Sequence, residues 1–262
     1  MKTVLADKTH IAVNFSSEAE FETICVRNAD RVFWSWVDSG IPIYVDMKQK
    51  VSSKAGKQTI PDGYMLWLDE NRESSCFYFV EYELASHPVY QHIISQIVKF
   101  KQSLSNHETR ELLARAFHPR LAEALQQTRF RKAYGRQYPH DVLTSLLSNK
   151  TSVGVIVVID EVNDELRETI EQVEELVKQY WVLEVNALVD VRGKSNPRPG
   201  AKVFGRYPGD DEYGNPEWYS AIFKQKVGGK FLVEWTDDDR TNTRVEQVVP
   251  FNQHILAVRV HA

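Results

Sequence analysis

PDGYMLWLDENRESSCFYFVEYEL, residues 61–84, contains two runs that predict neighbouring strands of one sheet. GYMLWLD (63–69) and CFYFVEYEL (76–84) are rich in aromatic residues, and the charged run between them favours a turn. Alternate residues of a strand project from the same face of a sheet, so Glu81 and Glu83 point the same way. Two carboxylates this close repel each other, which a solvated face tolerates and a bound cation relieves.

The position of Asp62 favours a bound cation over a solvated face. This residue directly precedes the first strand, and pairing of the two strands as a hairpin would bring it beside Glu81. A cation needs a third carboxylate from a different strand, whereas a solvated face does not. Oxygen ligands of this kind suit Mg²⁺ or Mn²⁺, so the sequence predicts a metal site here.

The flanking segments alternate between helix and strand patterns. VGVIVVI (153–159) is a continuous apolar run, which suits a strand buried on both faces. Helices are predicted over 16–33, 88–104, 107–148 and 163–180, and further strands over 41–50 and 182–191. The alternation predicts an α/β domain whose sheet has mixed strand directions.

These elements resemble the PD-(D/E)XK nuclease superfamily, which has a restriction-endonuclease-like mixed sheet flanked by helices. Pro61-Asp62, eighteen further residues and Glu81-Tyr82-Glu83 match its motif in spacing. The first helix is similar to that of the branched-DNA and mismatch endonucleases, where the Glu after the Ser, here Glu18, is a metal-site residue. QIVKF (96–100) is similar to the family's Q-x-x-x-Y, with Phe in place of Tyr. The resemblance covers about residues 16–191.

The resemblance implies metal-assisted hydrolysis of DNA phosphodiester bonds. Asp62, Glu81 and Glu18 would hold Mg²⁺ or Mn²⁺, and Gln96 would position water or phosphate. Read without the resemblance, Gln96 is a surface amide on a helix. The superfamily commonly forms dimers, so a homodimer is also expected.

Glu83 departs from the family pattern, because the motif has a lysine there. The carboxylate would then be a further metal ligand or a general base, or it marks a descendant that binds without cutting. Lys99 could reach in from the next helix and replace the missing charge. His87 and His92 flank the start of that helix, and His87 lies close to Glu83 in the sequence; lone histidines are usually structural or exposed.

Residues 99–136 form a basic segment in a chain of net charge −4. It holds nine basic and three acidic residues, and most of it lies in a polar helical insertion at about 105–150. Solvated helix faces would explain it, but contact with DNA phosphates explains the charge better. Phe130 and Tyr134 stand among the last basic residues and suit base stacking. The candidate DNA contacts are Lys99, Lys101, Arg129, Arg131, Lys132 and Arg136.

SNPRPG (195–200) predicts a linker between a domain at 1–194 and another at 199–262. Short strand patterns separated by turn residues, including Gly228-Gly229, predict a small all-β barrel. This part resembles Tudor and SH3-like domains, which bind a protein partner or DNA. In Tudor readers an aromatic cage holds a methylated side chain, whereas the same aromatics would otherwise form the barrel core. The matching positions are Phe204, Tyr207, Trp218, Tyr219 and Trp235, with Asp237 or Asp238.

The composition is that of a folded protein, with 42% hydrophobic and 26% charged residues. No apolar run is long enough for a membrane span or a signal peptide, so a soluble intracellular protein is expected. Cys25 and Cys76 stand among apolar neighbours and are predicted to be buried free thiols.

The sequence therefore predicts a Mg²⁺-dependent DNA endonuclease of repair, restriction or defence, with a barrel for substrate or partner recognition. One alternative is an inactive nucleic-acid-binding protein of the same fold. The other is a Tudor-type reader of a modified protein.

Overall fold

The computed structural model describes residues 2–261 except 4, 8–9, 14, 16, 35–39, 49, 57, 88, 165, 167, 169–178, 191–196, 211–215, 237–240, 246 and 251–253. By packing, the chain divides into two units. The larger is Ser17–Val185 with Val258–Ala262, and the smaller is Met1–Ser16 with Asn186–Ala257. The sequence had placed residues 1–16 with the α/β part and the boundary near 195; the structure groups these first residues with the C-terminal strands.

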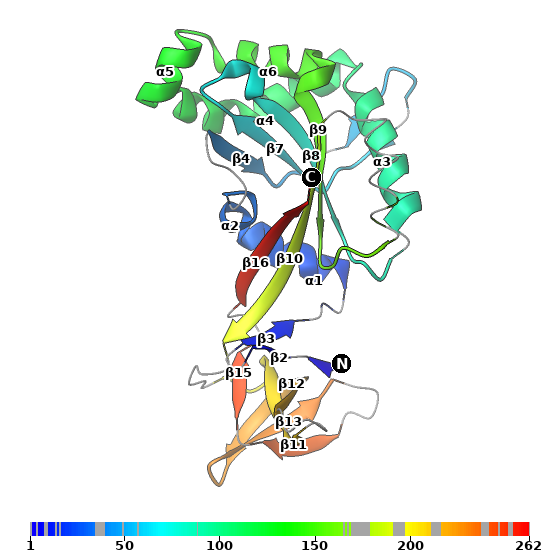
Figure 1. The fold of residues 1–262 in the computed structure, drawn as a ribbon, viewed down its shortest axis with the longest axis vertical. Coiled ribbons are helices and arrows are strands. Elements are labelled where there is room, and N and C mark those ends of the chain that lie inside the picture. Colours follow the sequence, from blue (N-terminus) through cyan, green and yellow to red (C-terminus); the bar gives the residue numbers. More distant parts are fainter. Residues whose placement is uncertain are drawn as a thin grey trace. The chain divides into compact units, whose positions relative to one another are not determined.

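A mixed sheet forms the centre of the larger unit (Figure 1). Its order is β10-β9-β8-β7-β4, with antiparallel pairing from β4 to β8 and parallel pairing from β8 to β10. The strands are β4 (Ile41–Val45), β7 (Gly63–Leu68), β8 (Cys76–Glu83), β9 (Val153–Ile159) and β10 (Tyr180–Asp190). The predicted hairpin, buried strand and mixed strand directions are confirmed.

Beyond Val185, β10 continues into the smaller unit, where its end pairs with β3 (His10–Val13), which pairs in turn with β2 (Leu5–Asp7). The strand β16 (His254–His261) also pairs with β10.

The first predicted helix is divided in two, α1 (Glu18–Arg27) and α2 (Ala29–Trp34). Ser17 caps α1, because its hydroxyl accepts a hydrogen bond from the Glu20 N–H at 3.2 Å. Asn28 ends α1, and its side-chain amide donates to the Ile24 carbonyl at 2.8 Å. The break turns the chain between two short helices that each bury apolar residues.

The connection from β8 to β9 is long and helical. It contains α3 (Val89–Ser103), α4 (His107–Gln126), α5 (Thr128–Tyr134), α6 (Pro139–Ser148) and the 3₁₀ turn η2 (Lys150–Ser152). β5 (Val51–Ser52) and β6 (Gln58–Thr59) form a two-stranded sheet, and η1 (Arg72–Ser74) lies in the turn between β7 and β8. Of the predicted helix 163–180, the structure describes helical residues at 164, 166 and 168.

Helices cover both faces of β8. Phe79 stacks on Phe100 of α3 at 4.6 Å, and Phe77 meets Phe117 of α4 at 5.5 Å. Tyr82, on the opposite face, makes an edge contact with Phe21 of α1 at 6.3 Å. Cys25 and Cys76 are buried and free, as predicted.

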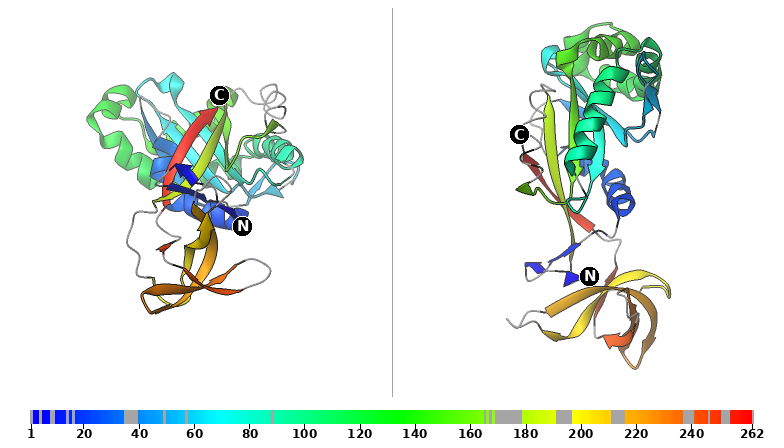
Figure 2. Two further views of the ribbon diagram at one scale, coloured as in Figure 1. Left: turned by 60° about the horizontal axis from the view of Figure 1, so that its bottom comes forward. Right: turned by 90° about the vertical axis from the view of Figure 1, so that its right-hand side faces the viewer.

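The smaller unit contains a curled sheet, visible from two sides in Figure 2. Its order is β14-β13-β12-β11-β15, and β1 (Lys2–Thr3) also pairs with β12. Gly228 and Gly229 have φ of 59° and 82° and join β12 to β13 in a tight hairpin that needs left-handed backbone at both positions. The strands are β11 (Lys202–Asp210), β12 (Pro216–Val227), β13 (Lys230–Trp235), β14 (Asn242–Val245) and β15 (Val248–Pro250).

Within the described part of the chain, no helix combines the length and apolar character needed to cross a membrane.

Candidate metal and catalytic centre

Asp62 lies against the acidic end of β8. The register pairs Gly63 with Val80, so Asp62 is the next residue along the hairpin, opposite Glu81. The N–H of Tyr82 donates a hydrogen bond of 3.0 Å to Asp62 Oδ2. The first carboxylate of the motif is therefore attached to the strand that carries the other two.

Glu81 is buried, with 5% of its surface exposed. Among the described residues its Oε1 has no hydrogen-bond partner. Burial raises the pKa of Glu81 well above its usual range, and the charges of Asp62, Glu83 and Glu18 raise it further. A hydrogen bond from the Asp62 backbone acts in the opposite direction. An ionised Glu81 needs an additional cation here.

Glu18 and His87 join Glu83 at the end of the strand. Glu18 is the first residue of α1, and its Oε2 lies 3.1 Å from His87 Nδ1. The same nitrogen is 3.8 Å from Glu83 Oε2. One ligand atom from each of these three residues lies within 4.8 Å of the other two, so the group could hold a metal ion. Glu83 is 3% exposed, whereas Glu18 and His87 are more accessible.

Lys48 places an ammonium group beside the carboxylates. Its Nζ lies 2.6 Å from Glu22 Oε1 and 3.0 Å from Asp62 Oδ1. Partial burial acts to lower the pKa of Lys48, but the hydrogen bonds to Glu22 and Asp62 outweigh it and raise that pKa. The lysine therefore stays charged. Lys48 and Glu22 were not predicted from the sequence, because neither belongs to the motif; Glu22 is one helical turn from Glu18 on α1, which was the available signal.

Asp160 was also missed, although it directly follows the buried strand β9, which pairs in parallel with β8. Its Oδ1 accepts a hydrogen bond of 2.8 Å from the Ala85 N–H. Burial raises the pKa of Asp160, and the backbone hydrogen bonds and the charge of His87 offset this in part. Asp160 therefore holds the segment between Glu83 and His87 at the carboxyl end of the sheet.

The described hydrogen bond of Gln96 joins it to Thr59 and not to one of the carboxylates. Its Oε1 accepts from the Thr59 hydroxyl at 2.6 Å, which ties α3 to β6. Lys99 is half-buried on the same helix. The lysine with a described ion pair to the motif carboxylates is Lys48, through Asp62, whereas Lys99 had been expected to replace the charge of the missing family lysine. The side chain of His92 is not among those that the structure describes.

The basic residues at the end of the insertion are exposed: Arg129, Arg131, Lys132 and Arg136. The two aromatics among them are buried, so the expectation that they stack on bases is wrong. Tyr134 shares a hydrogen bond of 2.6 Å with the Ser75 hydroxyl and donates to the Asp69 carbonyl at 3.0 Å. Phe130 belongs to the hydrophobic core of the larger unit. Arg129 lies over the Phe130 ring at 4.6 Å and 3.9 Å from Glu70.

Two of the expected cage aromatics are buried. Phe204 is 1% exposed and Trp235 is 4% exposed. The Trp235 indole N–H donates to the Thr243 hydroxyl at 2.8 Å, and its ring meets Tyr219 edge-on at 6.0 Å. Phe204 and Trp235 are therefore unavailable as cage walls, because the small unit needs them as core. The side chains of Tyr207 and Trp218, and residues Asp237 and Asp238, lie outside the description.

Comparison with family models, curated proteins and solved structures finds no match for this chain.

Proposed function

We propose that the larger unit is a metal-dependent nuclease of restriction-endonuclease-like fold that hydrolyses phosphodiester bonds in DNA. The observation that carries the proposal is the buried Glu81 Oε1, which has no hydrogen-bond partner among the described residues. The charges of three other carboxylates raise the pKa of Glu81: Glu18 on α1, Asp62 just before β7 and Glu83 on β8 itself. A divalent cation is the simplest partner for such a set.

The residues suited to the cation are Asp62, Glu81, Glu83, Glu18 and His87. Carboxylates fit Mg²⁺ and Mn²⁺ alike, but an imidazole ligand suits later transition metals better, so Mn²⁺ is the favoured ion if His87 takes part. When bound, the cation activates water as a nucleophile and offsets the negative charge that develops on the phosphate.

Lys48 supports the proposal by supplying a charge that Glu83 cannot. It approaches Asp62 from the segment after β4 rather than from β8. A protonated amine held there by two carboxylates can stabilise negative charge on the substrate phosphate. Glu83 would then serve as a ligand or as a partner for His87, and not as a substitute for lysine.

DNA binding is proposed for the exposed basic side chains of the helical insertion. Arg129, Arg131, Lys132 and Arg136 suit contacts with the phosphate backbone, which need charge but no aromatic platform. Lys99 and Lys101 on α3 are less suited to this contact, because Lys99 is half-buried and Lys101 lines a cavity. The curled sheet of the smaller unit, an SH3-like or Tudor-like module in this proposal, would bind a protein partner or DNA without a cage built on Phe204 and Trp235.

The test is cleavage of duplex, single-stranded, branched and modified DNA by the full chain with Mn²⁺ or Mg²⁺. Glu81→Gln and Asp62→Asn should abolish cleavage. Glu73→Gln, an exposed acid in the turn of the same hairpin, is the matched control and should cut normally. Equal cleavage by all four proteins would show that another site or a contaminant is responsible.

One observation favours the alternative of an inactive DNA-binding protein. Lys48 already neutralises Asp62 and Glu22 without any metal. Calorimetric titration with Mn²⁺ separates the two candidates. Failure of Mn²⁺ to bind, together with intact DNA binding and no cleavage, would establish the binding protein and reject the nuclease.

A further inference from the structure

A cavity of about 300 Å³ lies inside the larger unit, between the sheet and the helices α3 and α6. Apolar side chains form most of its wall: Phe79, Ile97, Phe100, Leu104, Leu147 and Val155. Its volume is at the lower end of the range found for small-molecule sites. Phe79 and Glu81 lie on the same face of β8, yet none of the carboxylates of the metal centre lines the cavity.

The polar part of the wall is cationic. It consists of Lys101, Arg110, Ser105 and Ser148, and no acidic residue lines the cavity among those described. Lys101 and Ser105 come from α3 and the turn after it, Arg110 from the first part of α4, and Ser148 from the end of α6. Three helices and the turn after α3 therefore bring two positive charges and two hydroxyls to one apolar space.

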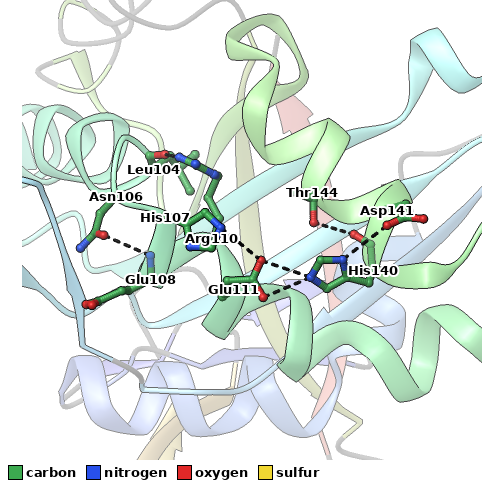
Figure 3. A network of polar contacts seen from close by, with 9 residues as sticks. All are labelled: Leu104, Asn106, His107, Glu108, Arg110, Glu111, His140, Asp141 and Thr144. Carbon is green, nitrogen blue, oxygen red and sulfur yellow. Dashed lines mark hydrogen bonds and ion pairs between the residues drawn. The ribbon is translucent and has the colours of Figure 1, made fainter.

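Arg110 has incomplete hydrogen bonding. Its Nη1 donates to the Leu104 carbonyl at 2.6 Å, a contact seen in Figure 3. Its Nε is buried and, within the described chain, has no acceptor. A guanidinium is always charged, and a buried N–H without an acceptor is costly. The site therefore lacks an acceptor, and a carboxylate or phosphate oxygen is the strongest one available to a guanidinium.

The two halves of the wall require different parts of one ligand. The guanidinium and the ammonium call for an anionic head, and the aromatic and aliphatic side chains call for an apolar body. The sugar–phosphate backbone of DNA meets only the first requirement, although Lys101 belongs to the predicted basic segment. Inorganic phosphate likewise leaves the apolar wall without a partner.

We propose that this cavity binds a small amphipathic anion of the fatty-acid type, with its carboxylate on Arg110 and Lys101 and its alkyl chain among Phe79, Ile97 and Leu147. The proposal is independent of the nuclease assignment, because the cavity and the metal centre share no lining residue.

The test uses the full chain labelled with ¹⁵N and three probes: octanoate, 1-octanol and inorganic phosphate. The Nε–H resonance of Arg110 should shift in a saturable way with octanoate. The alcohol has the same chain without the charge, and phosphate has the charge without the chain, so both should bind at least about tenfold more weakly.

Arg110→Gln should weaken octanoate binding at least about tenfold, measured by calorimetry. Arg115→Gln, an exposed arginine on the same helix, is the matched control and should bind as the wild type does. Leu147→Phe adds volume to the apolar wall and should weaken octanoate binding with Arg110 intact, which covers the case in which Arg110→Gln misfolds.

The proposal is overturned if octanoate leaves the Arg110 resonance unchanged, or if octanol binds equally well. Tight binding of phosphate alone would instead assign Arg110 and Lys101 to a simple anion or DNA-phosphate contact and would also reject the amphipathic ligand.

Discussion

Asp62 and Tyr82 are joined by a hydrogen bond of 3.0 Å from the Tyr82 N–H to Asp62 Oδ2. The other carboxylate oxygen of Asp62 faces Lys48. One side chain thus connects the backbone between Glu81 and Glu83 to the lysine. The position of the lysine is therefore coupled to the strand that carries the other two acids.

Replacing Glu81 with Gln should raise stability in the absence of metal. The amide keeps the shape but removes a charge that is buried beside three other acids. We expect a gain of roughly 1 kcal/mol, or about 2–4 °C in Tm, by calorimetry without metal. Mn²⁺ should then raise the Tm of the wild type but not that of the variant. An equal Mn²⁺-induced shift in both proteins would place the ion elsewhere.

Lys48→Met should separate metal binding from catalysis. Loss of the ammonium group leaves Glu22 and Asp62 more negative, so Mn²⁺ affinity should increase in a calorimetric titration. Cleavage should nevertheless fall by about 10²–10³-fold if the lysine stabilises developing charge. Lys50→Met removes an exposed lysine two residues away and should change neither quantity. Full activity in Lys48→Met would show that the lysine is only a counter-ion.

Asp160→Ala should loosen the segment that carries His87. It leaves the Ala85 N–H without its acceptor, which costs roughly 1–2 kcal/mol in the free energy of unfolding. Mn²⁺ affinity should fall as well, because His87 is then less well placed. Asp160→Asn retains an acceptor oxygen and should recover most of both effects. A stability loss with unchanged Mn²⁺ affinity would exclude His87 from the site.

His140 and Glu111 link α6 to α4 and should give a pH-dependent contribution to stability. The Glu111 oxygens lie 3.2 Å from His140 Nε2, as drawn in Figure 3. Hydrogen bonding to Glu111 and then to Asp141 raises the pKa of His140 above 6.5, and the hydrogen bond to His140 lowers the pKa of Glu111 below 4.5. His107 and Arg115 also act on Glu111 and lower its pKa.

The stabilisation by His140 is therefore present below its unfolded pKa and is lost as the pH rises through its folded value. The stabilisation by Glu111 is present above its unfolded pKa and is lost as the pH falls through its folded value. The Tm difference between wild type and His140→Gln should peak between those limits, near pH 5–6, and shrink in high salt. A difference that is constant from pH 4 to pH 9 would contradict an ionic link.

The sequence predicted those elements whose residues repeat a simple pattern. The aromatic hairpin, the seven-residue run of β9 and the Gly228-Gly229 turn all follow from local preference, and each appears in the structure. The hairpin register also follows from the spacing, which is why Asp62 could be paired with Glu81 in advance.

Residues that depend on tertiary packing were missed or misjudged. Lys48 and Asp160 come from segments with no motif, and only the assembled sheet brings them to the end of β8. Phe130 and Trp235 show the opposite error. Both were predicted to lie on a binding surface, but both side chains are buried. Burial is set by the whole domain, so local composition cannot decide such cases.

The face of β8 that carries Phe77 and Phe79 also carries Glu81 and Glu83, so aromatic core and carboxylates follow one another along a single line of alternate residues. Adding or deleting one residue inside this strand would exchange the two faces beyond that point and turn both acids toward Phe21. Insertions within β8 should therefore abolish function at any odd length, whereas the exposed turn at 70–74 should accept extra residues of either parity. Whether the number of inserted residues is odd or even thus constrains this strand independently of the identity of any one amino acid.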